Sequence, residues 1–155
     1  MRLIIIVAVV LVAVLGCSAM ATTIAPIAMS NRSLGGTALN DYTPGVVGAL
    51  GPNNIGLLVK TWGKVTWVDT ANQCFYIDDG SRIPAGTTRS DNGQTVYGVR
   101  VGYSGLATGV APVTPPAEND YVLVTGICST IRYTVGDDIR PNVRVRSGAD
   151  ISNLN

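Results

Sequence analysis

The N-terminal segment is the most apolar stretch of the chain. After Met1 and Arg2, residues 3–15 read LIIIVAVVLVAVL without a polar side chain. As a helix this run would span about 20 Å, which is short of the roughly 30 Å hydrocarbon core of a bilayer. A basic start, a short apolar run and small residues after it are typical of a secretory signal peptide. We therefore expect an exported protein, with a retained single-span anchor as the alternative.

Two cleavage sites follow the apolar run. The tripeptide AMA at 19–21 fits signal-peptide cleavage and would make residues 1–21 the leader. The sequence VLGC at 14–17 resembles a bacterial lipobox, in which residues 1–16 are removed and Cys17 is acylated. The first site predicts a soluble secreted protein, and the second predicts a lipoprotein anchored at Cys17.

Residues 22–54 show neither a period of 2 nor one of 3.6. Gly, Pro, Asn, Ser and Thr are scattered among apolar residues, which indicates a linker or an extended arm. The segment also contains Tyr42, Val46, Val47 and Leu50. We therefore expect part of the arm to pack on the domain that follows.

From residue 55 the pattern changes to β-branched and aromatic residues, which predicts strands. The predicted strands are 55–69, 73–78, 95–103, 121–125 continuing toward residue 128, and 142–146. Gly63 in the long first strand predicts a bend or bulge. The segments 82–94 and 104–120 are predicted loops, and the proline content of the second one disfavours a helix. Five strands of this kind predict an all-β, partly closed Greek-key barrel over residues 55–150, followed by a tail at 151–155.

Four motifs in this region carry a resemblance to a known fold. They are VKTWGKVTWVD at 59–69, FYIDDGS at 75–81, VRV at 99–101 and DYVLVTG at 120–126. Together they resemble the oligonucleotide/oligosaccharide-binding (OB) fold, and more narrowly the small OB-like domains of exported bacterial proteins of unassigned function. The resemblance covers residues 55 to about 150 and implies a five-stranded barrel. Most matched positions are core valines and turn glycines, so the motifs say little about a ligand.

One departure from the family pattern lies between the third and fourth strands. Typical OB-like barrels have a helix there, and this chain has none in its sequence pattern. We expect loop residues such as Leu106, Val110 or Val113 to plug that end of the barrel instead.

The resemblance also implies a binding face. Ligands of OB folds usually cross strands two and three, where aromatic rings stack on bases or sugars beside cations. The candidate ligand-binding residues are therefore Tyr76, Tyr97, Arg100, Tyr103, Arg144 and Arg146. The last two alternate with valines on their strand and share its outer face. The alternative is that all six are ordinary solvated positions of a barrel.

The two tryptophans lie five positions apart on the first strand. A bulge at Gly63 would decide which face each of them takes, and we expect at least one of Trp62 and Trp67 to pack in the core.

Composition narrows the function. The 155 residues allow one domain, and the 14% charged residues fall below the roughly 25% of typical soluble domains. The absence of histidine excludes Ser-His and Cys-His catalysis and histidine metal sites. Removal of Arg2 with the leader brings the formal charge from +1 to zero, whereas nucleic-acid-binding proteins usually carry a strong positive balance. We therefore expect neither an enzyme nor a nucleic-acid-binding protein.

Two pairs of adjacent acids stand next to glycines. Asp78-Asp79 and Asp137-Asp138 have the composition of turns, and a metal or acid–base role is the weaker alternative. We expect no metal and no cofactor.

Two cysteines remain in the domain. Export would allow a disulfide between Cys74 and Cys128. In an OB barrel, however, they fall beside opposite ends of the first strand, beyond the roughly 7 Å that a disulfide tolerates between Cα atoms. Two separate thiols are therefore the favoured interpretation.

These observations predict a non-catalytic OB-fold binding module that is extracellular or held in the cell envelope. Its partner would be a saccharide, a peptide or a protein. The alternative is a structural or assembly subunit of a surface layer or extracellular filament, which would use the arm and the barrel edges for self-assembly. Membrane contact is expected only through a lipid on Cys17 or an uncleaved N-terminal anchor.

Overall fold

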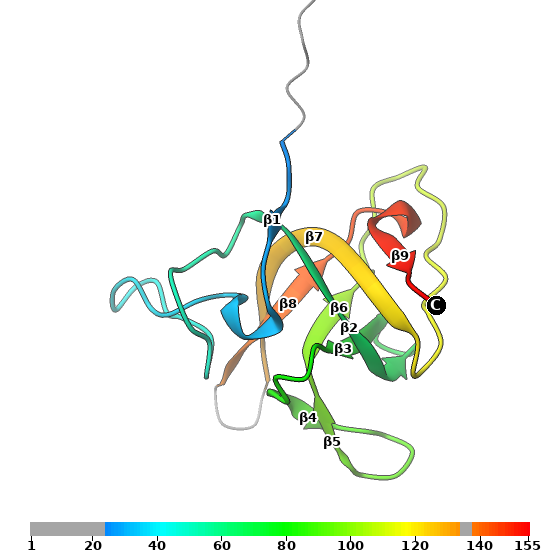
Figure 1. Cartoon of the computed structure of the whole chain (residues 1–155), viewed down its shortest axis with the longest axis horizontal. Helices are drawn as coiled ribbons and strands as arrows, with labels where there is room; N and C mark the ends of the chain where they lie inside the picture. The colour runs from blue at the N-terminus through cyan, green and yellow to red at the C-terminus, as the bar shows by residue number, and fades with distance from the viewer. Residues whose placement is uncertain (1–23, 134–137) are drawn as a thin grey trace, which may run out of the picture.

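The computed structural model describes residues 24–133 and 138–155 (Figure 1). The leader, Cys17, both cleavage sites and Asp137 lie outside this part of the chain. Its elements are β1 (Ile27–Ala28), η1 (Asn31–Ser33), β2 (Leu58–Asp69), β3 (Cys74–Asp78), β4 (Pro84–Thr88), β5 (Thr95–Tyr97), β6 (Val99–Gly102), β7 (Tyr121–Arg132), β8 (Ile139–Arg144), η2 (Gly148–Asp150) and β9 (Ile151–Asn153). Over the described ranges, no helix has both the length and the apolar character needed to cross a membrane.

Five strands close into a barrel. Their order is β2-β3-β6-β8-β7, and β7 pairs back onto β2. The β6–β8 pair is parallel, and the other four pairs of the barrel are antiparallel. The prediction of an all-β barrel is confirmed, and the arrangement is consistent with an OB-like fold. Two short strands pair alongside the barrel strands, β1 parallel to β2 and β9 antiparallel to β7. Residues 151–153 therefore form a strand where a tail was predicted.

The predicted third strand is divided in two, and the predicted loop before it contains a strand. β5 and β6 are separated by Gly98, and β5 pairs with β4 in a hairpin. Gly98 has a φ of +105°, and a Cβ there would lie 2.1 Å from the carbonyl oxygen of Ile77. Only glycine fits this position. The predictions of one strand over 95–103 and a loop over 82–94 are therefore wrong. The strand is interrupted at Gly98, and its first part pairs with β4 to form a separate hairpin.

The bulge of β2 lies at Thr66 and not at Gly63. The pairing with β3 shifts register between Val65 and Trp67. Gly63 instead allows the backbone of β2 to lie close to that of Asp78, since a Cβ at this position would lie 2.8 Å from the carbonyl carbon of Asp78. The bulge reverses the inside–outside alternation, so both tryptophans lie outside the barrel core.

The barrel core is built mainly from valines on all five strands. Its members on the strands are Val59, Val65, Phe75, Ile77, Val99, Val101, Val122, Val124, Cys128 and Val143. At one end, the loop after β6 contributes Tyr103, Leu106 and Val113. Of the three residues predicted to plug this end, Val113 belongs to the core cluster, Leu106 is partly buried against it, and Val110 is half-buried outside it.

The N-terminal arm closes the other end. Leu34 is fully buried in the barrel core. Asn31 is also fully buried, donates its amide to the carbonyl of Ile77 and accepts a hydrogen bond from the Thr61 hydroxyl. The arm therefore shares the core with the barrel, as expected for part of it.

Candidate functional site

The pairing register of the strands shows which residues lie side by side on the outer face of the barrel, and these residues form rows across the strands, which we call the grid. One row across β3, β6, β8 and β7 is Tyr76, Arg100, Asn142 and Ser129, and the next is Cys74, Gly102, Arg144 and Ile127. The intervening residues of these strands, such as Val101 and Val143, belong to the core. Successive strand residues face opposite sides, so the two rows lie outside. They place three candidate residues, Tyr76, Arg100 and Arg144, on one surface.

The β3 end of this surface is covered. The β4–β5 hairpin packs there and forms a second apolar cluster that we call the covered half: Trp67, Cys74, Tyr76, Ala85 and Val96. The rings of Trp67 and Tyr76 stack with centroids 5.5 Å apart and an interplanar angle of 14°. Tyr76 is only 3% exposed. β3 is therefore buried on both faces.

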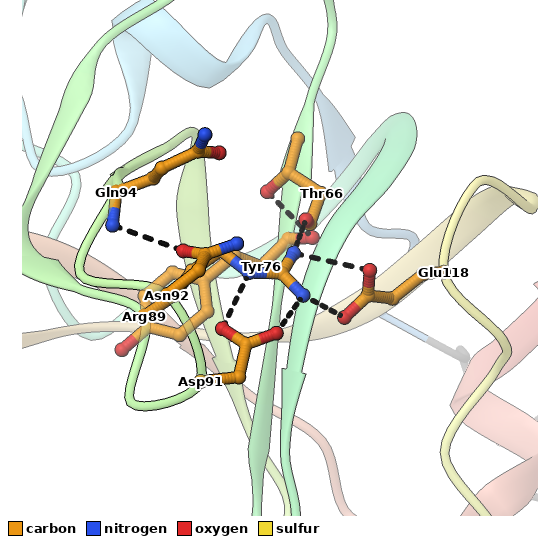
Figure 2. Close-up of polar contacts among 7 residues, drawn as sticks. All are labelled: Thr66, Tyr76, Arg89, Asp91, Asn92, Gln94 and Glu118. Atoms are coloured by element: carbon orange, nitrogen blue, oxygen red, sulfur yellow. Dashed lines mark hydrogen bonds and ion pairs between the residues drawn. The ribbon is translucent and has the colours of Figure 1, made fainter.

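An arginine fastens the hairpin to the barrel (Figure 2). Arg89 donates from Nη1 to the carbonyl of Thr66 at 3.1 Å, at the bulge of β2. Its guanidinium also pairs with Asp91 at 2.7 Å and with Glu118 at 2.9 Å. The hydrogen bonds from Arg89 lower the pKa of the Asp91 carboxyl. The Thr66 hydroxyl in turn donates to the carbonyl of Tyr97 at 2.7 Å, so both hairpin strands are tied to β2.

A second set of contacts joins the hairpin and β3 to β8 and to Tyr133, which follows β7. The Tyr76 hydroxyl lies 3.1 Å from that of Tyr133. Burial, together with this hydrogen bond, raises the pKa of Tyr76. Arg140 donates to the carbonyl of Pro84 at 3.1 Å and pairs with Asp138 at 2.6 Å. Tyr76 is therefore a structural residue of the covered half.

The other two candidate tyrosines are also engaged. The Arg82 guanidinium lies 4.7 Å from the centre of the half-buried Tyr97 ring. Tyr103 is 8% exposed and its ring packs against Phe75 in the core. The structure does not bring the three tyrosines together as an exposed stacking surface.

The remainder of the grid runs from the buried Gly102 and Asn142 through the half-buried Arg100 and Ser129 to the exposed Arg144. We call it the open half: Arg100, Gly102, Ser129, Asn142 and Arg144. These residues line a hollow of about 210 Å³. Arg100 Nη1 donates to Asn142 Oδ1 at 2.8 Å, and Asn142 Nδ2 donates to the Ser129 hydroxyl at 2.7 Å. The polar side chains are thus held in fixed positions.

The candidate arginines differ in their charge environment. Arg146 forms an ion pair with Asp150 at 2.6 Å. Among the described residues, the hydrogen-bond partners of Arg100 and Arg144 are neutral: Asn142, the Cys74 thiol, the carbonyl of Asn72 and the carbonyl of Ser104. The open half therefore carries two positive charges that no described carboxylate neutralises.

A second hollow adjoins the first. It has about 350 Å³ and is lined by the 104–107 loop, Ile127, Arg144, Val145 and Arg146. Arg144 lines both hollows. A ligand that contacts Arg144 could therefore extend over an apolar patch that includes Ile127 and Leu106.

Of the acids expected in turns, Asp78 and Asp79 accept hydrogen bonds in the segment after β3, whereas the side chain of Asp138 pairs with Arg140. Asp79 accepts hydrogen bonds from the backbone and hydroxyl of Ser81 and from the backbone of Asn31. Burial alone raises the pKa of Asp79, but these hydrogen bonds outweigh it and hold the value below normal. Asp78 accepts from the backbone N–H of Arg82. Within the described ranges, no three Cys, Asp or Glu residues are grouped so as to hold a metal ion.

Cys74 and Cys128 are both buried free thiols. Cys74 lies in the covered half and Cys128 in the barrel core. Burial raises the pKa of both thiols.

Sequence reasoning missed three members of the open half. Asn142 and Ser129 carry no motif, and only the β6–β8–β7 register places them beside Arg100. Gly102 was assigned to a strand without a role. The one usable signal was the alternation of β8, which correctly placed Arg144 outside.

A separate exposed surface on β2 and β7 was also missed. Trp62 and Tyr121 are each 46% exposed on neighbouring strands. Lys64 pairs in register with Tyr121, and Lys60 lies on the same side of β2 as Trp62. The two hollows described above are lined by other residues, and the open half with its two arginines is the candidate site argued below.

Comparisons with protein-family models, with curated proteins and with solved structures find no match for this chain. The fold class therefore rests on the strand order, and the functional argument rests on the two halves of the outer face.

Proposed function

We propose that the protein is an exported, non-catalytic binding module of the bacterial cell envelope, which takes a saccharide, peptide or protein partner on the open half of its barrel. The observation that carries the proposal is the pair of arginines without carboxylate partners, Arg100 and Arg144, in a concave polar surface. Polar side chains that their neighbours hold in place suit binding, because little conformational freedom is lost when a ligand arrives.

The chemistry of the site supports binding without catalysis. The chain has no histidine, and Asp79 is engaged by three hydrogen bonds in a turn. The two thiols have raised pKa values and are buried, which disfavours the reactive thiolate. Export is the part of the proposal that rests on the N-terminal apolar run alone.

Among the three partner classes, the geometry favours a saccharide. The two hollows have about 210 and 350 Å³, a size that suits one or two sugar rings better than a folded partner. Hydroxyl-rich ligands need several donors and acceptors in fixed places, and Asn142, Ser129 and the two arginines offer them.

The test is a binding survey with the exported, processed protein. Intact mass first identifies the mature N-terminus and any acyl group on Cys17. The protein is then applied to glycan and peptide arrays, beside an Arg100→Gln/Arg144→Gln double variant. The proposal expects binding to glycans that the double variant loses. It would be contradicted by an unprocessed chain starting at Met1, or by a double variant that binds every partner as the wild type does.

The alternative, a structural or assembly subunit, is favoured by a different observation. The N-terminal arm exposes large apolar side chains, with Leu39 at 67%, Tyr42 at 96% and Leu50 at 57%. Such residues would suit contacts between subunits of a surface layer or filament. Size-exclusion chromatography and electron microscopy of the mature protein separate the two functions. Ordered polymers would favour assembly, and a monomer at high concentration would contradict it.

A further inference from the structure

We propose that the open half binds one oxyanion group, a carboxylate or phosphate ester carried by a sugar residue, between Arg100 and Arg144. This inference rests on the proposed function, because it names the ligand chemistry of the same site. OB-fold ligands usually cross strands two and three, which correspond to β3 and β6 here. The β4–β5 hairpin occupies the face over β3, so the site we propose is displaced onto β6, β8 and β7.

The two arginines lie on neighbouring strands, two residues apart in register, with Gly102 directly beside Arg144. Arg100 pairs with Asn142, and Gly102 pairs with Arg144. A Cβ at Gly102 would lie 2.7 Å from Arg100 Nη1, and a Cβ at Gly105 would lie 3.2 Å from Arg144 Nη2. Each guanidinium therefore lies close against glycine backbone. A side chain at either glycine would displace the guanidinium beside it.

Most of the hydrogen-bonding capacity of Arg144 is not used by residues 24–133 and 138–155. A guanidinium has five N–H donors, and within these ranges Arg144 makes one side-chain bond, at 3.3 Å, to the carbonyl of Ser104. Arg100 donates to Asn142 and, at 3.3 Å, to the carbonyl of Asn72. The planar fork of a guanidinium matches carboxylate and phosphate oxygens in a two-point contact. Since no described carboxylate occupies these donors, an oxyanion is the ligand group that complements both of them.

The surroundings of Arg144 favour an anion attached to a ring. The adjoining hollow brings Leu106, Ile127 and Val145 beside the guanidinium. One face of a pyranose carries mainly C–H groups and can cover such apolar side chains, while its acidic group reaches the arginines. The zero net charge left after removal of the leader provides little long-range attraction for a polyanion.

The experiment is a titration of the ¹⁵N-labelled mature protein followed by NMR, with three probes: sodium glucuronate, glucose and inorganic phosphate. The proteins compared are the wild type, Arg100→Gln, Arg144→Gln and the control Arg32→Gln. Arg32 is an exposed arginine of the arm, so its variant removes the same charge away from the site. Thermal unfolding of each variant verifies that the fold is retained.

We expect saturable shifts at Gly102 and Ser104 with glucuronate and none with glucose at equal concentration. Each site variant should weaken glucuronate binding about tenfold or more, because it removes a charge-assisted contact, and Arg32→Gln should not. Raising the salt concentration should weaken binding further. Phosphate binding weaker than that of glucuronate supports a sugar ring, and phosphate binding alone overturns that assignment.

The inference is overturned if neither anion shifts the open half, or if Arg32→Gln weakens binding as much as the site variants do. Its failure is distinguishable from failure of the proposed function. Neutral glycans or peptides that bind at Gly102 and Ser104 would leave the proposed function standing, whereas a double variant that binds every partner as the wild type does would remove both.

Discussion

The covered and open halves occupy the same face of one barrel but are built from different side chains. Trp67, Tyr76 and Cys74 lie under the hairpin with exposed fractions between 0% and 6%. Arg100, one grid position beyond Tyr76, and Arg144, two positions beyond Cys74, line a hollow. The difference shows that the hairpin, and not the barrel, decides which part of the surface is available to a ligand. The covered half should therefore control stability, and the open half should control binding.

The largest effect is expected from truncating the ring at the centre of the covered half. Trp67→Ala should lower the free energy of unfolding by about 3–5 kcal/mol, because it leaves a cavity against Tyr76 and beneath the hairpin. Trp62→Ala on the same strand is the matched control and should cost less than about 1 kcal/mol, since Trp62 is 46% exposed. Urea unfolding measures both. Equal losses would mean that the hairpin does not seal a second core.

The next largest effect distinguishes Arg89, which should affect stability, from Arg144, which should affect binding. Arg89→Met should cost about 1–2 kcal/mol, because it breaks the bond to the Thr66 carbonyl and both ion pairs (Figure 2). Arg144→Met should change unfolding by less than about 0.5 kcal/mol, because Arg144 makes one long hydrogen bond. Glucuronate binding should show the reverse order. A binding loss in Arg89→Met without one in Arg144→Met would contradict the division of roles.

The two thiols report how the hairpin opens. Cys74 and Cys128 are both fully buried, but Cys74 is shielded partly by the hairpin and Cys128 lies in the barrel core. Local opening of the hairpin exposes only Cys74, so it should react with iodoacetamide about tenfold or more faster than Cys128. Peptide mass spectrometry after timed labelling gives both rates. Equal rates would indicate that the barrel and hairpin open together.

The smallest effect concerns the border of the open half. Burial alone raises the pKa of Asp150, but hydrogen bonds from Arg146 outweigh it and hold the value below normal. A lowered folded-state pKa stabilises the protein above the unfolded value of about 3.9, and this contribution is lost as the pH falls through the folded value. Asp150→Asn should therefore cost about 1 kcal/mol at pH 7 and progressively less below about pH 4. Urea unfolding of the wild type and the variant at pH 7 and below about pH 4 checks this. The same loss of stability at both pH values would contradict the ion pair as its source.

The same comparison shows what sequence reasoning could achieve. Alternation of polarity predicted the barrel strands and placed Arg144 outside, because period 2 is a local property of a strand. The β4–β5 hairpin was missed because Pro84 and Gly86 look like loop residues, and strand formation there depends on pairing with β5. The burial of Tyr76 was missed for the same reason: its place on β3 predicts an outward side chain, but the hairpin covers it together with Trp67 and Tyr133.

The arm and the open half were incompletely predicted for a related reason. Leu34 and Asn31 are fully buried, yet they stand in a segment without any period. Asn142 and Ser129 meet Arg100 only through cross-strand register, which one sequence does not reveal. Contacts between distant segments decide all four positions.

The most direct test of the division into two halves is a residue-resolved map of the glucuronate titration. The account predicts shifts at Gly102, Ser104, Ser129 and the Asn142 side-chain amide, with Ala85 and Val96 of the covered half unchanged. Shifts centred on Ala85 and Val96, with an unchanged open half, would contradict it.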